Sequence, residues 1–310
     1  MTPPPMAERP GAPDGLAVVD KAAGWTSHDV VAKSRGLLGT RKVGHAGTLD
    51  PDATGMLLLG VGRATRLLRF LSPLGKHYEG VVELGTETAT LDAAGEVTAR
   101  HDMAGITLAE VQAVAAEHFT GPILQVPPMV SALKVDGVRL HQLARQGIEV
   151  EREARPVTIH ELTVDAVPGD AGAFTLHVHC SSGTYVRSLA ADLGRALGGG
   201  AHLRSLRRTA VGSFTLDEAV PLEALDPEAL LTPAEAVRDL PAVTVDEATA
   251  TSVGFGKVLA PAELGVEALG AGPWAVRGPD GSLLAVYERH RDGELAKPAV
   301  VVAPAGSTSR

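Results

Sequence analysis

The sequence predicts an α+β fold in which one large domain is followed by a small β-rich domain. Helix-like and strand-like segments follow one another without the regular spacing of βαβ units. After Leu216 the composition becomes acidic and is interrupted by prolines, which is typical of a change of domain. The length of 310 residues also exceeds the usual size of a single domain. Two domains of unequal size are therefore expected.

The N-terminal elements are marked by capping and turn residues. Residues 1–14 contain several prolines and no apolar stretch, so we expect a disordered tail and no signal peptide. Leu16–Val19 is typical of a short strand. Thr26 and Ser27 offer an N-cap for a helix that ends near Leu38, before Gly39. The next predicted elements are a loop at Lys42–Asp52, a buried strand at Thr54–Val61, a helix at Arg63–Leu71 and a strand at His77–Leu84.

The clearest strand pattern lies at Phe174–Cys180, where apolar and polar side chains alternate. The side chains of Phe174, Leu176, Val178 and Cys180 are predicted to share one face, with Thr175, His177 and His179 on the other. Gln125–Val157 is long and irregular, which is typical of a functional segment. The flanking predicted elements are a helix from the capping box Thr107–Glu110 to about His118, a helix at Tyr185–Leu197 and a strand at Leu203–Phe214.

The last part of the chain predicts a compact β structure. Short strands are expected at Ala242–Val245, Trp274–Arg277 and Leu283–Tyr287, and the last two flank the hairpin signal Pro279–Gly281. The predicted organisation is a tail at 1–14, a large domain at 15–240 with an insertion at about 124–156, and the small domain at 241–310.

The net charge of −9 is distributed unevenly. Residues 215–310 contain 15 acidic and 7 basic side chains, so the rest of the chain is nearly neutral. Within it, Lys33–Arg69 has 7 basic and 2 acidic residues, and Gly183–Arg208 has 5 and 1. These two segments either form a surface that binds a polyanion or are ordinary solvated helix faces.

Several residue types limit the possible functions. A single cysteine, Cys180, excludes an internal disulfide and a cysteine-rich zinc site, and favours a cytoplasmic location. The longest apolar run, Met56–Val61, is too short to span a bilayer, so no membrane association is expected. His177 and His179 resemble half of a metal site, but no third ligand has a suitable spacing, and we expect no metal.

The segment Gly44–Gly55, GHAGTLDPDATG, is the sharpest candidate for chemistry. Pro51 favours an extended backbone at Asp50, so the carboxylate would lie on a stiff loop. A fixed carboxylate suits a nucleophile or a general base. The alternative is that Asp50 only caps a turn.

Further motifs follow this segment in order. Lys76–Tyr78 (KHY), Leu84–Asp92 (LGTETATLD), Cys180–Arg187 (CSSGTYVR) and Gly200–Arg208 (GAHLRSLRR) are joined by Ser131–Lys134 (SALK) and Ala144–Gly147 (ARQG). In type and spacing they resemble the TruB family of tRNA pseudouridine synthases, from about Gly15 to Val211. The resemblance implies a mixed-sheet catalytic domain, a thumb-like RNA-contacting insertion and a PUA-like C-terminal domain.

The resemblance also implies roles for individual residues. Asp50 corresponds to the catalytic aspartate, and Arg187 to an arginine that pairs with it. Tyr78 corresponds to a ring that stacks on the flipped base, and His45 to a histidine that assists entry of the RNA. Lys76, Tyr185 and Leu206 are the further positions expected to contact the substrate.

The implied activity is isomerisation of uridine to pseudouridine at position 55 in the T-loop of tRNA. It requires no cofactor, and the expected partner of a monomeric enzyme is the T-arm of tRNA. A tRNA chaperone activity is expected to accompany it. A second hypothesis is a tRNA-binding chaperone whose catalysis is incidental or lost. A third is a nucleoside or glycoside hydrolase, which needs a second carboxylate, and Asp52 is the only candidate nearby.

Overall fold

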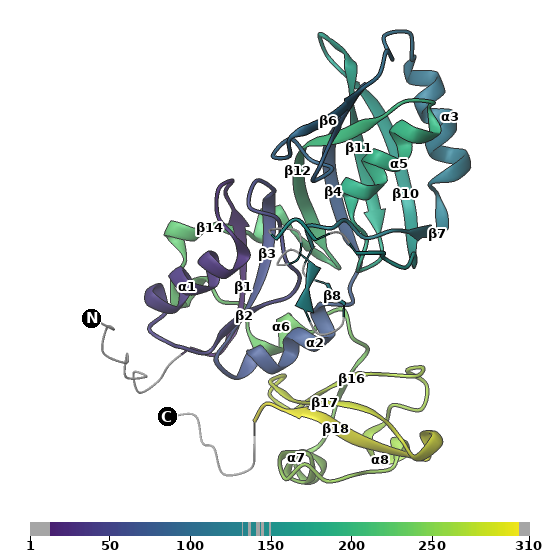
Figure 1. Ribbon diagram of the computed structural model, residues 1–310. Helices are drawn as coiled ribbons and strands as arrows, with labels where there is room; N and C mark the ends of the chain where they lie inside the picture. Colours follow the sequence, from purple (N-terminus) through teal and green to yellow (C-terminus); the bar gives the residue numbers. More distant parts are fainter. Residues whose placement is uncertain are drawn as a thin grey trace. The chain divides into compact units, whose positions relative to one another are not determined.

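The computed structural model describes residues 13–303 except residues 132, 136–137, 141–142, 144–145 and 149. The chain forms two compact units (Figure 1). The first unit comprises residues 1–51, 56–72 and 212–310, and the second comprises residues 52–55 and 73–211. Most of the predicted tail, together with Ala132, Ala144 and Arg145 of the insertion motifs, lies outside the described residues. Within the described part, no helix has the length and apolar character needed to cross a membrane.

The N-terminal part of the first unit is built around buried strands. Strand β1 (Gly15–Lys21) lies between β3 (Thr54–Val61) and β14 (Val220–Pro221), and β2 (Val43–His45) pairs antiparallel with β3. Helix α1 (Ser27–Leu37) begins at the predicted cap, where the Thr26 hydroxyl accepts a bond from the Asp29 backbone N–H. The predicted loop at 42–52 is therefore wrong in its first part, because residues 43–45 continue the sheet. The strand alternates too briefly to be recognised in sequence.

The remaining elements of this part are short. They are η1 (Gly62–Leu67), α2 (Leu68–Leu71), β13 (Phe214–Thr215), η2 (Leu216–Glu218), η3 (Leu222–Ala224), η4 (Pro227–Ala229) and α6 (Pro233–Ala236). The helical prediction for 63–71 is confirmed as a 3-10 turn that continues into a single α-helical turn.

The small β-rich part predicted near the C-terminal end is present. Strands β15 (Ala242–Thr244), β16 (Trp274–Arg277), β17 (Leu283–His290) and β18 (Leu295–Val301) form one sheet in that order. Its helical elements are α7 (Glu247–Gly254), α8 (Pro261–Leu264) and η5 (Arg291–Gly293). Trp274 and Tyr287 are fully buried in its core. Strand β18 was not predicted because it contains Pro298, which is tolerated since the strand lies at the sheet edge.

Three arginines from the first basic segment contact this C-terminal part within the first unit. Arg63 Nη1 donates to the Val302 carbonyl at 3.1 Å, and Arg66 Nη1 donates to the Val301 carbonyl at 2.9 Å. Arg69 lies 3.5 Å from a carboxylate oxygen of Glu288. These guanidinium groups therefore stabilise the packing of the unit, so the charge of Lys33–Arg69 is only partly available to a polyanion.

The second unit is a five-stranded antiparallel sheet with two helices on one face (Figure 1). Its strand order is β12 (Ala201–Val211), β4 (Lys76–Leu84), β11 (Asp170–Cys180), β10 (Arg155–Val167) and β7 (Gly121–Gln125). Helices α3 (Leu108–His118) and α5 (Val186–Ala196) pack their apolar residues against the sheet. The smaller strands are β5 (Thr86–Thr88), β6 (Val97–Arg100), β8 (Lys134–Val135) and β9 (Val138–Arg139).

The alternation along β11 is confirmed. Phe174, Leu176, Val178 and Cys180 are all buried in the core of the second unit. The 13-residue strand β10 is absent from the predicted elements, and its first residues fall in the segment predicted to be irregular. Its sequence, RPVTIHELTVDAV, carries charged residues at both ends and a bulge between Ile159 and Glu161 that interrupts the alternation.

The polar face of β11 carries histidines that come close to one another. The rings of His77 and His179 stack with centroids 4.0 Å apart, and His160 lies 4.7 Å from His179. Burial lowers the pKa of His179 below its ordinary value of 6.5, and the charges of His77 and His160 lower it further. Among the described residues, no group of His, Cys, Asp or Glu side chains could hold a metal ion.

We expect His179 to make the protein less stable as the pH falls below about 6.5. The unfolded chain then takes up a proton at this position more readily than the folded protein, so the free energy of unfolding decreases. Urea unfolding followed by circular dichroism gives the free energy of unfolding at pH 7.5 and at pH 5.5. Its decrease between these two pH values should be smaller for His179→Gln than for the wild type. The control is His177→Gln, an exposed neighbour on the same strand. Equal acid losses in the two variants would contradict the prediction.

Candidate active site

The backbone on both sides of Asp50 is anchored by residues of the first unit. Ser27 Oγ accepts a hydrogen bond from the Leu49 N–H at 2.9 Å and donates to the Leu49 carbonyl at 3.2 Å. The Pro51 carbonyl accepts from Lys21 Nζ at 2.8 Å and from the Gly24 N–H at 2.9 Å. Asp50 itself is partly exposed. Asp50 is thus a partly exposed residue on a backbone that is fixed before and after it.

Lys21 is a structural cation. It is 1% exposed, and its ammonium group also donates to the carbonyls of Ala22 at 3.0 Å and Trp25 at 2.8 Å. A buried charge is tolerated when its donors are satisfied by hydrogen bonds. Lys21 therefore links the end of β1, the β1–α1 connection and the residue that follows Asp50.

His45 ends strand β2 and is partly exposed. Its ring meets that of His28 edge to face, with centroids 5.5 Å apart and an interplanar angle of 80°. The predicted role of His45 in RNA entry remains a prediction.

Directly after Pro51 the chain enters the second unit, where Thr54 and Gly55 add to the sheet. Thr54 and Gly55 pair in parallel with Arg207 and Arg208 of β12. Gly55 has a φ of +96°, and a Cβ atom there would lie 2.2 Å from the Arg208 carbonyl oxygen. Only glycine permits this close approach.

Tyr78 and Leu206 lie on adjacent strands of the second unit. Leu206 is opposite Gly80 and Tyr78 is opposite Arg208, so the two side chains share one face of the sheet as diagonal neighbours. Both are partly exposed, and both pack against the core of this unit. The structure thus brings together a ring and an apolar side chain that were predicted to contact the base.

Lys76 is buried, contrary to what a phosphate-binding lysine on the surface would require. It is 4% exposed, and its ammonium group donates to the Leu74 carbonyl at 2.6 Å. Burial lowers its pKa to about 8, and the nearby charge of Arg208 acts in the same direction. A role of Lys76 in substrate binding remains a prediction.

Tyr185 and Arg187 lie at the beginning of helix α5. Tyr185 is the N-cap residue and is partly exposed. Arg187 is 4% exposed, and its guanidinium group donates to the carbonyls of Thr90 at 3.0 Å and Val130 at 2.9 Å. It also lies 3.5 Å from Asp92 Oδ2. Arg187 is therefore buried and held in one orientation, so it is not an exposed surface arginine.

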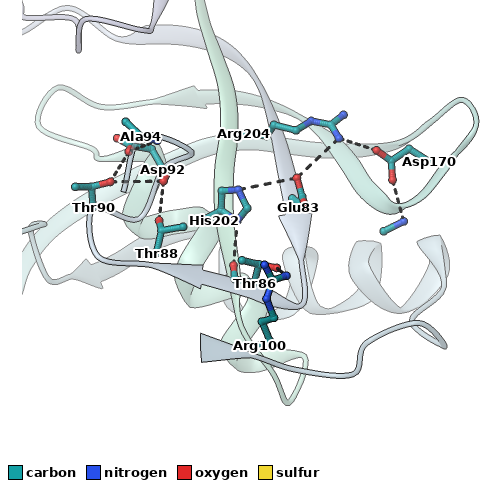
Figure 2. Close-up of polar contacts among 11 residues, drawn as sticks. Glu83, Thr86, Thr88, Thr90, Asp92, Ala94, Arg100, Asp170, His202 and Arg204 are labelled. Atoms are coloured by element: carbon teal, nitrogen blue, oxygen red, sulfur yellow. Dashed lines mark hydrogen bonds and ion pairs between the residues drawn. The ribbon is translucent and has the colours of Figure 1, made fainter. Parts of the chain in front are cut away.

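The turn that carries Asp92 is itself ordered by hydrogen bonds (Figure 2). Asp92 Oδ1 accepts from the Thr90 hydroxyl and, at 3.2 Å, from the Ala94 N–H, and the Asp92 carbonyl accepts from the Thr88 hydroxyl at 2.6 Å. Buried His202 contacts the Thr86 carbonyl through Nδ1 at 3.0 Å, which joins β12 to the same region. These bonds fix the carboxylate that faces Arg187.

The predicted site residues thus divide between the units. Asp50 and His45 belong to the first unit, and Tyr78, Tyr185, Leu206, Arg187 and Lys76 belong to the second. Sequence reasoning missed Lys21, Ser27 and Gln125, which bind backbone atoms of these segments. Their only signal in sequence is a polar side chain at the end of an apolar strand or at the start of a helix.

Comparisons with known proteins identify the family. The profile of the TruB family pseudouridylate synthase N-terminal domain matches residues 35–186, and that of the tRNA pseudouridylate synthase B C-terminal domain matches residues 187–263. The chain is 49% identical over 299 residues to a tRNA pseudouridine synthase B from an Arthrobacter species, covering 94% of this chain and 97% of that protein. The identity to the Streptomyces coelicolor protein of the same name is 47%, covering 92% and 97%.

A solved structure supports the same fold. A chain in the crystal structure of a Cbf5-Nop10-Gar1 complex superposes with a TM-score of 0.72 at 24% identity, covering 98% of this chain and 92% of that one. The predicted α+β fold with a small C-terminal β domain is confirmed. The chain belongs to the TruB family of tRNA pseudouridine synthases, isomerases that convert uridine in tRNA to pseudouridine.

Proposed function

We propose that the protein isomerises the uridine at position 55 in the T-loop of tRNA and that Asp50 is the catalytic carboxylate. The anchoring of Leu49 and Pro51 by Ser27, Lys21 and Gly24 carries this proposal. It places a partly exposed aspartate on a fixed backbone, and a fixed position is what attack on a sugar carbon or removal of a ribose proton requires.

The reaction rearranges bonds within one nucleotide. The bond between N1 of uracil and C1′ of ribose breaks, the base turns, and a bond between C5 and C1′ forms. N1 gains a proton and C5 loses one, so no oxidant, reductant or cofactor enters the balance. Asp50 either forms a bond to the sugar or removes a proton from it, and both routes begin from the ionised carboxylate.

The target base must leave its stack before it reacts. We propose that Tyr78 stacks on the flipped base, because base–aromatic stacking contributes roughly 1–3 kcal/mol and tolerates rotation of the base. Leu206, its diagonal neighbour, supplies an apolar contact, and Tyr185 a further wall. Arg187 supplies a positive charge of fixed orientation, and His45 assists entry of the RNA.

We propose the T-arm of tRNA as the partner of a monomeric, cytoplasmic enzyme. The exposed side chains of Lys33 and Arg41 supply cations for phosphate contacts. Arg63, Arg66 and Arg69 are occupied by contacts within the protein, so they contribute less to this surface.

The proposal predicts that the purified protein converts one uridine of an unmodified tRNA transcript. Pseudouridine should form at position 55 and should be absent from a matched transcript that carries cytidine there. Chemical mapping of pseudouridine at nucleotide resolution tests this. Modification at another position would reject the assigned site, and release of free uracil would instead favour the hydrolase hypothesis.

A further inference from the structure

Gln125, the last residue of strand β7, makes two hydrogen bonds to the backbone of a single distant residue. Its side-chain nitrogen Nε2 donates to the Tyr185 carbonyl at 3.1 Å, and its oxygen Oε1 accepts from the Tyr185 N–H at 2.7 Å. The side chain is 2% exposed. Because both ends of the amide are used, neither atom can be exchanged for the other without loss of a bond.

Tyr185 depends on this contact because it occupies the N-cap of α5 without a side-chain cap of its own. N-cap residues have non-helical backbone angles, and a side chain from elsewhere in the chain can satisfy the backbone groups at this end of a helix. Gln125 supplies that partner and thereby sets the direction in which the Tyr185 side chain leaves the backbone.

Two further bonds join the residues after Gln125 to the first turn of α5. The Ser188 hydroxyl donates to the Val126 carbonyl at 2.9 Å, and Arg187 Nη2 donates to the Val130 carbonyl at 2.9 Å. The segment 125–130 is therefore hydrogen-bonded along the turn that carries both Tyr185 and Arg187. Gln125 differs from Ser188 and Arg187 in that it binds both the N–H and the carbonyl of one residue, Tyr185.

We infer that Gln125 is a positioning residue for the isomerisation, acting through Tyr185 and the start of α5. The inference rests on the proposed function, in which Tyr185 contacts the substrate. A displacement of about 1 Å at a catalytic site costs on the order of a hundredfold in rate, so the two bonds matter more for turnover than for folding.

The test is Gln125→Glu, whose bonding depends on pH. An ionised glutamate still accepts from the Tyr185 N–H, but its second oxygen faces the Tyr185 carbonyl and repels it. Protonation restores a donor at that oxygen, and burial favours the protonated form. The ratio of the variant rate to the wild-type rate should therefore be about 0.01 at pH 8.5. It should rise at least about tenfold when the pH is lowered to 6.

Single-turnover pseudouridine formation with excess enzyme gives this ratio at each pH, and the tRNA dissociation constant should change less than about twofold. Gln125→Met, which has a similar shape but no polar atoms, should be slow at every pH. The control is Gln112→Met on helix α3 of the same unit. Gln112 is exposed, and its side chain donates a single bond to the Val164 carbonyl of β10 at 2.8 Å. This control should react at the wild-type rate.

Each outcome is decisive. A ratio that stays flat with pH for Gln125→Glu, or a wild-type rate for Gln125→Met, overturns the positioning role. Thermal unfolding of each variant separates slow chemistry from loss of fold, and equal rate losses for the Gln125 and Gln112 variants would indicate a structural effect alone. Absence of product with the wild-type protein would instead overturn the proposed function and, with it, this inference.

Discussion

Asp50→Asn is expected to abolish pseudouridine formation while tRNA binding remains. Asparagine keeps the shape of the side chain but cannot act as a nucleophile or a base, so the single-turnover rate should fall by at least about 10⁴-fold. Because Asp50 is partly exposed and its neighbours are held through their backbone, the fold should be unaffected. Tritium release from C5-labelled uridine in tRNA measures the rate, and filter binding measures the affinity.

The matched control is Asp52→Asn, which changes an exposed carboxylate two residues further along. This variant should react within about threefold of the wild-type rate, because an exposed charge contributes little to the stability of the fold. Equal loss in both variants would favour a mechanism with two carboxylates. Tritium release that survives Asp50→Asn would refute the catalytic role of Asp50. Refolding of misfolded tRNA by the inactive variant would support an additional chaperone activity.

Arg187→Lys is expected to produce the second-largest loss, on the order of a hundredfold in the single-turnover rate. Lysine keeps the positive charge but replaces a planar fork by a single point, so it cannot bridge the carbonyls of Thr90 and Val130 together. A positive charge would remain near Asp92, but the cationic side chain would no longer be held in a fixed orientation. The dissociation constant for tRNA should stay within about twofold.

Arg195→Lys on the same helix serves as the control for this variant. Arg195 is half-exposed and pairs only locally with Asp192 at a spacing of three residues, so its replacement should leave the rate unchanged. Thermal unfolding of both variants is needed because Arg187 is buried. A wild-type rate for Arg187→Lys would show that the fork geometry is unimportant.

Much of the fold could be predicted because local patterns coincide with tertiary structure. The capping boxes at Thr26 and Thr107 and the alternation along β11 each depend on residues that are close in sequence. Strands β10 and β18 could not be predicted, because a bulge and an edge proline disrupt their patterns and only pairing with neighbouring strands defines them.

The candidate site was predictable only where a motif exists. The GTLDP run marks Asp50, and the similarity of later segments indicates Tyr78 and Arg187. Lys21, Ser27 and Gln125 leave no comparable signal, because each binds backbone atoms of a segment 22 to 60 residues away in sequence, at Pro51, Leu49 and Tyr185. Backbone groups are the same in nearly every residue, so no pattern of side chains predicts such a contact.

The anchors of Asp50 have a consequence for the order in which the protein acquires its structure. Lys21, Gly24 and Ser27 all lie within 30 residues of Leu49 and Pro51, and every one of these groups is translated by residue 51. Contacts between residues 22 to 30 apart close smaller loops than pairings across the whole chain, and N-terminal segments emerge first from the ribosome. The loop that carries the carboxylate can therefore begin to adopt its shape before translation supplies residues 73–211 of the second unit.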